Sequence, residues 1–511
     1  MSATPATTKK STDITIYGAT GFVARHVVTY LARTAVSLEH VGRSNVLKIT
    51  LAGRNGAKLS DMEAEWEKRF DLLCQATGPE HVTGRVVWDT YVADGDDERA
   101  LRAMVSRTKV VLNCAGPFAL YGGRVVAACA ASGTDYVDIT GEVAWVAEMR
   151  AAHGPTAAAS GARIVSLCGY DSVPSDLSVL AAVRALQNKK KERARGDEAA
   201  AEVAIVRATT WHASFGMPNG GTYKTAQDYP VKFERCASNG IPFLLDDPLV
   251  LTHPTTVRNN PAMESWRARL VRAEWWNALS FQFHAIFIGG VSAPFLMAPV
   301  NAKVVHASAA ALHYGGTGVD VDVDDDKSKN KPTTNAFTYE ERFLPAGFRG
   351  TAQLKTFSFI PVFFIHIFTL LGMLILKLPI LGPWILENIL GGPGTGLSDA
   401  MCAGGHAEVY AEVRTAPNPK TGHVDKGNAL VQFKGDPGNW VTAQCVSEAA
   451  LTLLLVDRKA LPPRSEDGFG TPAELLGMPL LERLQQSTVR PVNVVTDARL
   501  QTPATEWRMH P

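Results

Sequence analysis

Cysteine and net charge are both scarce in this sequence, and each scarcity argues against a class of function. The seven cysteines are scattered and none forms a CxxC pair, which argues against a disulfide framework or a structural zinc site. A reducing compartment is the expected setting. Lysine plus arginine number 51 and aspartate plus glutamate number 50, so the net charge is +1. Without a dense basic stripe, no nucleic-acid partner is expected.

Several catalytic motifs are also missing. No nucleophile elbow, HExxH pair or cysteine–histidine spacing appears, so hydrolase chemistry and a metal site are not predicted. The opening residues MSATPATTKKSTD are polar and lack an apolar core, which predicts no secretory signal. They are too short and too weakly basic to predict a transit peptide. The apolar share of 46% supports a large core, and the length fits about two or three domains.

The strongest local signal is the segment ITIYGATGFVARH, residues 14–26, in which an apolar strand meets a glycine turn and a helix. Gly18, Gly21 and Ala24 follow GxxGxxA spacing. Gly18 permits the tight turn, Gly21 permits close approach of a pyrophosphate, and the helix start attracts phosphate. Because strand and helix flank the turn, the pattern predicts dinucleotide binding rather than a merely structural turn. The predicted contacts are Gly18, Ala19, Thr20, Gly21, Phe22 and Val23.

The next strand pattern, residues 47–53, predicts which dinucleotide is bound. An NAD-preferring fold places an acidic residue after this strand, whereas Arg54 stands here with Asn55 and Lys58 behind it. An arginine suits bidentate contact with a 2′-phosphate, so the expected cofactor is NADP, as NADPH. A solvated surface arginine is the alternative. Arg54 lies 36 positions after Gly18, and an inserted loop at 35–45 explains the long interval.

A later strand pattern, residues 109–118, ends in a small-residue segment that extends the predicted site. Ligands of open parallel sheets bind at the carboxyl ends of the strands, so this segment is expected to touch the cofactor. Its members are Cys114, Ala115, Gly116 and Pro117. Strand and helix patterns alternate to about residue 180, as a Rossmann-type parallel sheet requires.

Several longer phrases share the pattern of one family. They are YGATGFVA, LAGRN, VLNCAGPF, SGTDYVDITGE, CGYDSVPSDL, GGPGTGLSDA and KGDPGNWVTAQCVSEAALTL. Together they resemble the saccharopine dehydrogenase-like oxidoreductases, which include the mycobacterial trans-acting enoyl reductases. The resemblance covers nearly the whole chain and is stronger in the amino half. It implies an oxidoreductase, and members of the family are associated with lipid droplets, membranes and reduction of lipid precursors.

The predicted fold class is α/β, with an N-terminal Rossmann-type parallel sheet and a C-terminal α+β substrate domain that carries a hydrophobic segment. After about residue 200, strand alternation such as that of GHAEVYAEVRT is typical of an antiparallel or mixed sheet. The predicted parts are a flexible N-terminus (1–12), an NAD(P)-binding domain (13–200), a substrate domain (201–356, with a disordered loop at 321–334), a membrane- or lipid-associated segment (357–390) and a C-terminal part that completes the substrate domain (391–511).

The hydrophobic segment opens with FSFIPVFFIHIFTLLGMLIL, residues 357–376, about 20 residues without formal charge and long enough to cross a bilayer. Three arrangements remain open: a spanning helix, a hairpin inserted at an interface, and a buried helix pair. We favour the hairpin, because the strands after it belong with the domain before it. The expected location is therefore membrane-associated and intracellular, on a lipid droplet or, alternatively, at a mitochondrial or plasma membrane.

A reductase of this kind needs a proton donor near the nicotinamide. Tyr136, Asp138 and Glu142 follow a strand end at the expected edge, and Asp171 follows the next one, so these four are the predicted catalytic residues. Helix capping is the alternative for Asp138. His212 is expected to be a core or surface histidine rather than an acid–base group.

The sequence thus predicts an NADPH-dependent oxidoreductase acting on a hydrophobic, enoyl-type lipid substrate. A membrane-associated binding or scaffold protein with a non-catalytic Rossmann domain is the alternative. A third possibility, an amino-acid dehydrogenase, is disfavoured by the apolar stretch at 280–300. The oligomeric state and the substrate are not predicted.

Overall fold

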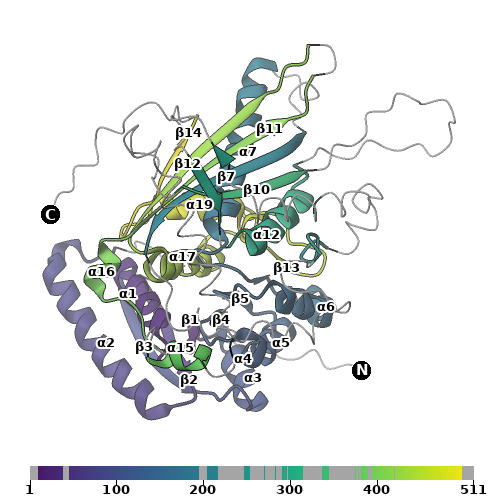
Figure 1. The fold of residues 1–511 in the computed structure, drawn as a ribbon. Coiled ribbons are helices and arrows are strands. Elements are labelled where there is room, and N and C mark those ends of the chain that lie inside the picture. Colours follow the sequence, from purple (N-terminus) through teal and green to yellow (C-terminus); the bar gives the residue numbers. More distant parts are fainter. Residues whose placement is uncertain are drawn as a thin grey trace.

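The computed structural model describes most of the amino half of the chain and selected parts of the rest. The described residues are 10–37, 45–194, 204–216, 247–253, 270, 282–283, 291–295, 297–314, 337–344, 375, 378, 381–388, 394–418 and 421–497. Their helices and strands form two seven-stranded sheets with helices packed on them. Figure 1 shows the first sheet below the second.

The first sheet is wholly parallel, with strand order β3-β2-β1-β4-β5-β6-β13. Its strands are β1 (Thr12–Tyr17), β2 (Val46–Gly53), β3 (Arg85–Val92), β4 (Thr108–Asn113), β5 (Asp135–Asp138), β6 (Ile164–Val165) and β13 (Phe469–Gly470). The order 3-2-1-4-5-6 is that of dinucleotide-binding sheets, and it reverses direction between β1 and β4. The predicted parallel sheet of Rossmann type is therefore confirmed.

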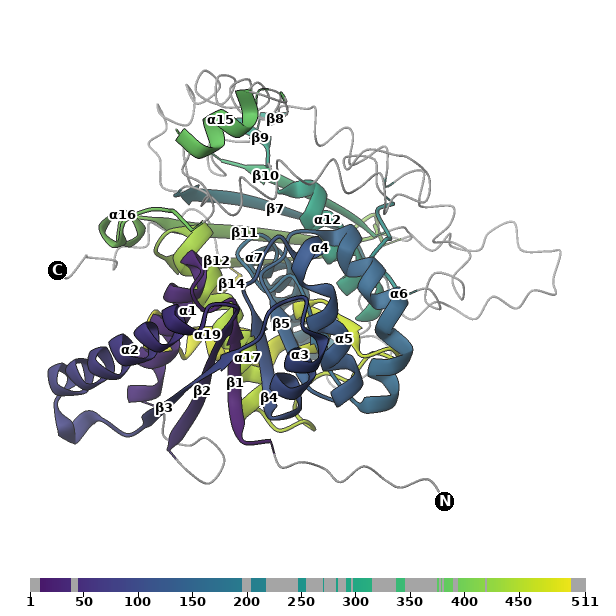
Figure 2. The same cartoon turned by 90° about the horizontal axis from the view of Figure 1, so that it is seen from below.

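Helices cover both faces of this sheet. One face carries α1 (Phe22–Val36), α2 (Gly56–Thr77) and α17 (Thr442–Leu455), and the other carries α3 (Glu98–Ser106), α5 (Gly123–Ser132) and α6 (Val143–Ser160). A short helix, α4 (Phe118–Tyr121), precedes α5. Both views place α1 and α2 on the side opposite α3, α5 and α6 (Figure 2). Strands buried on both faces explain the continuous apolar runs in the sequence.

The second sheet is mixed, with strand order β14-β12-β11-β7-β10-β9-β8. Its strands are β7 (Ile205–Phe215), β8 (Gln282–Phe283), β9 (Val291–Pro294), β10 (Thr338–Phe343), β11 (His406–Thr415), β12 (Lys426–Lys434) and β14 (Asn493–Thr496). One pair, β7 with β10, is parallel and the other neighbours are antiparallel. Two helices, α7 (Val173–Ala194) and α12 (Ala298–Ala311), pack against one face. The expected second domain with a mixed sheet is therefore confirmed.

The carboxyl part of the chain contributes to both sheets. Strands β11, β12 and β14 belong to the second sheet, whereas β13 extends the first and α17 packs on β4 and β5. Further helices in the described residues are α15 (Leu381–Asn388), α16 (Asp399–Ala403), α18 (Pro472–Leu475) and α19 (Gly477–Gln485), with the short turns η1 (Pro79–His81) and η3 (Pro437–Val441). The predicted domain limits remain a prediction, but the first sheet is completed by residues far beyond 200.

Two predicted elements have different limits. The strand pattern that begins at Ala162 forms a strand only over Ile164–Val165, and the pattern that begins at Asp135 forms one only over Asp135–Asp138. The physical reason is the Asp138 carboxylate, which accepts the backbone N–H groups of Thr140 and Leu167 and so turns the chain out of the sheet. Leu167 adopts a left-handed φ of 65° at that point.

The hydrophobic segment lies mostly outside the described residues, as does the predicted loop at 321–334. Within the described part, α15 is eight residues long, and its Leu381 and Trp384 side chains are exposed. Among the helices that the structure describes, none combines the length and apolarity needed to cross a membrane.

Candidate functional site

The glycine turn after β1 is held tightly against the end of β4. Gly18 has a φ of 77°, and a Cβ added to it would lie 2.9 Å from both the Cβ and the backbone nitrogen of Ala115. The N–H groups of Gly18 and Ala19 donate to the carbonyl of Ala52 at 2.9 and 3.1 Å. Only glycine satisfies both the left-handed φ and the close approach. The turn and the β4 loop therefore form one surface at the switch point of the sheet.

Helix α1 begins at this surface. Gly21 is its N-cap, and the Gly21 N–H donates to the Gly18 carbonyl at 2.9 Å. Thr20, Gly21 and Phe22 are half-buried, whereas Ala19 and Val23 are buried. The first N–H groups of a helix have no intrahelical acceptor, and the helix dipole favours an anion there. The exposed helix start therefore fits a pyrophosphate.

Two cations follow the end of β2. Arg54 is exposed and makes no hydrogen bond or ion pair with the part of the chain that the structure describes. Asn55 caps α2, because its Oδ1 accepts the Lys58 N–H at 3.0 Å. Lys58 is also exposed. Asn55 thus fixes the helix start, while Arg54 is available for a phosphate.

The loop after β4 completes the surface. Asn113 is buried, and its Oδ1 accepts the Ala115 N–H at 2.9 Å. The Cys114 N–H donates to the carbonyl of Tyr17 at 2.8 Å, which ties the loop to β1. Gly116 is exposed and is joined to half-buried Pro117 by a cis peptide bond. These residues lie beside the glycine turn, as a shared cofactor contact requires.

The geometry of this surface agrees with comparisons to known proteins. Residues 14–165 match the family model described as the saccharopine dehydrogenase NADP binding domain. Over 503 residues the chain is 30% identical to a Mycobacterium tuberculosis protein provisionally named a trans-acting enoyl reductase, covering 96% of this chain and 98% of that one. The chain belongs to the saccharopine dehydrogenase-like oxidoreductases. The resemblance seen in the sequence is thereby confirmed.

Two further relatives match this oxidoreductase over part of its length. A Caenorhabditis elegans protein named a lipid droplet localized protein is 34% identical over 213 residues, which are 42% of this chain and 43% of that one. A Mycobacterium leprae trans-acting enoyl reductase is 40% identical over 171 residues, covering 34% and 35% of the two chains.

Tyr136 and Asp138, predicted as catalytic, are buried in the oxidoreductase and hydrogen-bonded. The Tyr136 hydroxyl accepts from Asn113 Nδ2 at 3.0 Å. Asp138 accepts from the Thr140 and Leu167 N–H groups and, at 2.9 Å, from the Ser166 hydroxyl. Burial nevertheless raises the pKa of Asp138 to about 6. Both residues shape the loops at the ends of β4 and β5.

Glu142, like Asp138, accepts backbone N–H groups that hold a loop in place. Its two carboxylate oxygens accept the N–H groups of Phe118 and Ala119, each at 2.9 Å, and the side chain is buried. The carboxylate therefore holds the start of α4, directly after the Gly116–Pro117 loop, against the start of α6.

We expect Glu142→Gln to lower the free energy of unfolding by about 2–4 kcal/mol, because a glutamine presents one N–H₂ group to a buried N–H that needs an acceptor. Denaturant unfolding measures this loss. Glu98→Gln is the control, since exposed Glu98 pairs with Arg102 on the same helix and such pairs contribute less than about 1 kcal/mol. Unchanged stability together with lost NADPH turnover would instead support the predicted catalytic role of Glu142.

Asp171 differs from the other three predicted residues. Its carboxylate is half-buried and makes no hydrogen bond among the residues that the structure describes. It lies near Gly141, where an added Cβ would be 3.8 Å from Asp171 Oδ2 and 3.9 Å from Met297 Cε. Burial, and then the charge of Glu341, raises the pKa of Asp171 to about 6. A carboxyl group with such a pKa suits proton donation near neutral pH.

Sequence reasoning missed a polar cluster on the second sheet, centred on buried Glu341 and His212. In the segment TYEERF three charged residues stand between two aromatic residues, and the structure buries its four central residues in β10. Charged residues enclosed by aromatic ones are the signal that could have marked Glu341. Its partner His212 lies 129 positions earlier, so no local pattern connects the two.

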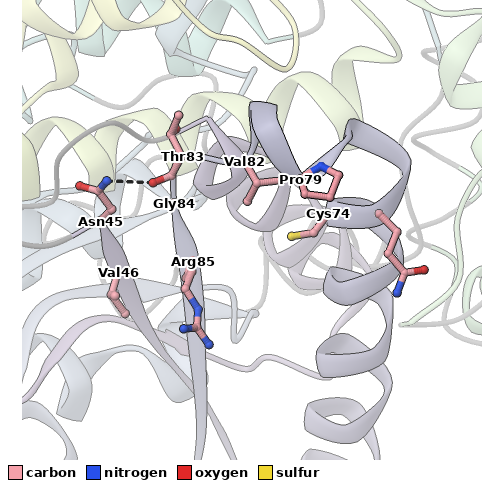
Figure 3. A pocket seen from close by; sticks show the side chains of 9 residues that line it. Asn45, Val46, Cys74, Pro79, Val82, Thr83, Gly84 and Arg85 are labelled. Carbon is pink, nitrogen blue, oxygen red and sulfur yellow. Dashed lines mark hydrogen bonds between the residues drawn. The ribbon is translucent and has the colours of Figure 1, made fainter.

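A pocket of about 400 Å³ lies elsewhere, at the amino-terminal ends of β2 and β3 (Figure 3). Val46 and Arg85 line it where these strands begin, and Cys74 and Pro79 close it from α2 and the following turn. The Asn45 Nδ2 group donates to the Thr83 carbonyl at its rim. Because the glycine turn lies at the carboxyl ends of the strands, this pocket is separate from the dinucleotide surface.

Proposed function

We propose that this protein is an NADPH-dependent reductase of a hydrophobic, enoyl-type lipid substrate that works at a membrane or lipid-droplet surface. The observation that carries the proposal is the switch point of the first sheet. There the glycine turn, the start of α1 and the exposed Arg54 offer contacts for a pyrophosphate and a 2′-phosphate. The names of the M. tuberculosis and M. leprae relatives support the enoyl substrate.

The roles of the residues follow from their places. Gly18 to Val23 and Cys114 to Pro117 would hold the dinucleotide, with Arg54 and Lys58 on its adenosine side. NADPH supplies a hydride when bound. Asp171 would then provide the proton that balances the reduction, since it is the half-buried carboxyl group at the edge formed by β5 and β6.

Two observations support a lipid surface as the place of action. Residues 357–376 carry no formal charge, and the following α15 exposes Leu381 and Trp384. Exposed apolar side chains beside such a segment suit insertion into an interface. The name of the C. elegans relative points to the lipid droplet.

The first test is a titration with NADPH and NADH, followed by cofactor fluorescence. We expect Arg54→Ala to weaken NADPH binding about 10- to 100-fold and to leave NADH binding unchanged, because one charge-assisted phosphate contact contributes about 1.5–3 kcal/mol. Arg69→Ala is the matched control, since exposed Arg69 pairs with Glu65 along α2. An equal loss for both cofactors would contradict the assignment of Arg54.

One observation favours the alternative of a binding or scaffold protein. Tyr136, Asp138 and Glu142 are all engaged in hydrogen bonds that hold the fold. Consumption of NADPH on addition of lipid extracts separates the two functions, because a scaffold binds the cofactor without oxidising it.

A further inference from the structure

A buried histidine–glutamate pair joins two neighbouring strands of the second sheet. His212 on β7 and Glu341 on β10 are exposed by 1% and 0%, and His212 Nε2 lies 2.7 Å from Glu341 Oε1. The same oxygen accepts from the Ser175 hydroxyl at 2.6 Å and from Asn301 Nδ2 at 3.1 Å. The Tyr339 hydroxyl also donates to it, at 3.2 Å. Ser175, Asn301 and Tyr339 hold the Glu341 carboxylate in place, and the carboxylate in turn fixes the orientation of the imidazole ring.

The other polar atom of each partner is unsatisfied. His212 Nδ1 and Glu341 Oε2 are buried and have no hydrogen-bond partner among the described residues. A buried polar atom left unpaired costs about 1–3 kcal/mol, and such atoms in native proteins call for a functional explanation. In the ion-paired form both ring nitrogens carry protons, so the Nδ1–H group is a donor without an acceptor in the part of the chain that the structure describes.

The pair lies beside the predicted reaction edge. Ser175 stands in the first turn of α7, which begins two residues after Asp171. A second connection runs from the Ser172 hydroxyl to Asn301 Oδ1 at 3.3 Å, and from Asn301 to Glu341. The charge of Glu341 also acts on Asp171. The histidine pair and the candidate proton donor therefore belong to one neighbourhood.

Aromatic side chains cover one face of the ring. Phe295 stacks on the imidazole, with 4.4 Å between ring centroids, and Phe343 stacks on Phe295 at 6.1 Å. Phe295 and Phe343 are half-buried, as is Met297, two positions after Phe295. One oriented N–H donor within an apolar cluster suits a carbonyl oxygen attached to a hydrocarbon chain.

We propose that His212 is a catalytic residue that hydrogen-bonds through Nδ1 to the carbonyl oxygen of a conjugated enoyl substrate, and that Glu341 is its positioning residue. The inference rests on the proposed reductase function and names its substrate class, an α,β-unsaturated thioester or ketone. Hydride addition to the β-carbon moves the electron pair of the C=C bond toward the carbonyl oxygen. His212 Nδ1–H stabilises the resulting enolate oxygen, and Asp171 then gives its proton to the α-carbon, which restores the C=O bond.

Two substitutions at His212 separate this role from a structural one. A glutamine places its amide nitrogen near Nε2 and keeps the bond to Glu341, whereas an asparagine places it near Nδ1 and keeps the outward donor. We expect His212→Gln to lower kcat about 100-fold or more, the usual effect of losing one oxyanion donor, and His212→Asn to recover part of that loss. A structural histidine predicts the reverse order, because the glutamine preserves the buried hydrogen bond.

The assay follows NADPH oxidation with the trans-2-dodecenoyl thioester of N-acetylcysteamine in detergent micelles. His306→Gln is the matched control, because His306 is a buried histidine on α12 that forms no ion pair with a carboxylate among the described residues. Its kcat should stay within about twofold of the wild type. Equal effects of the substitutions at His212 and His306 would overturn the proposal.

A second readout does not depend on turnover. In the ¹⁵N spectrum of the full chain with NADP⁺, adding the saturated dodecanoyl thioester should shift the His212 Nδ1 resonance and leave Nε2 in place. Glu341→Gln should let the ring change tautomer and should reduce that shift. A bound probe that leaves Nδ1 unmoved would overturn the inference alone. Wild-type protein that binds no NADPH, or never oxidises it, would overturn the proposed function and this inference with it.

Discussion

Gly18→Ala is expected to abolish measurable NADPH binding and to lower the free energy of unfolding by about 2–5 kcal/mol. A left-handed φ of 77° costs an L-residue about 1–2 kcal/mol, and the new Cβ would lie 2.9 Å from Ala115, so that overlap adds about 1–3 kcal/mol. The loops after β1 and β4 must separate to admit the methyl group, which disturbs the phosphate surface. Denaturant unfolding and cofactor fluorescence measure the two effects.

Gly161 offers a matched control for this prediction. It ends α6 with a φ of 83°, and a Cβ added there would meet nothing within 4 Å. Gly161→Ala should therefore show only the cost of the left-handed conformation, about 1 kcal/mol, with NADPH binding intact. If the two alanine variants lost the same stability and both bound NADPH, the close approach of Gly18 to Ala115 would not be required for cofactor binding.

The second large effect concerns pH. Asp176 in the first turn of α7 is buried and accepts the Ala473 N–H at 2.8 Å, and burial raises the pKa of Asp176 to about 7. A carboxyl group whose folded-state pKa is raised stabilises the fold below its unfolded pKa near 4, and this contribution is lost as pH rises through 7. The wild type should therefore lose about 2–3 kcal/mol of stability from this group between pH 5 and pH 8.

Asp176→Asn keeps an acceptor for Ala473 and removes the ionisation, so the loss between pH 5 and pH 8 should shrink in this variant. Burial also raises the pKa of neighbouring Glu474 to about 7, which leaves a residual slope of the same sign. Asp425→Asn is the control, because Lys190 lowers the pKa of Asp425, so this carboxyl group stays ionised between pH 5 and pH 8 and its replacement should leave the slope unchanged. Denaturant unfolding at several pH values measures all three proteins. An unchanged slope in Asp176→Asn would show that Asp176 does not carry the proton.

The sequence was informative wherever function depends on neighbours along the chain. The glycine turn, the strand before it and Arg54 after β2 are local patterns, and the structure places them together at the switch point of the sheet. The alternation in β11 likewise predicts a strand without knowledge of its partners.

Contacts between residues far apart in the sequence could not be predicted from such local patterns. The Asp138 carboxylate replaces strand hydrogen bonds beyond β5 and β6, so both strands end earlier than their apolar runs suggest. Helix α7 begins at Val173, so Ser175 and Asp176 lie inside its first turn, where their partners come from distant parts of the chain. His212 gains its partner Glu341 only through the parallel pairing of β7 with β10.

The contribution of α17 and β13 to the first sheet has a consequence for synthesis in the cell. The strands and helices of the amino-terminal third are translated first, but the surface that α17 covers stays bare until about residue 455 has left the ribosome. At 5–20 residues per second, that delay is roughly 15–50 s after α7 has been made. During this interval the nascent chain presents an uncovered apolar sheet face, which is a substrate for chaperones. Premature termination before α17 should therefore yield an aggregating fragment and not a smaller cofactor-binding protein.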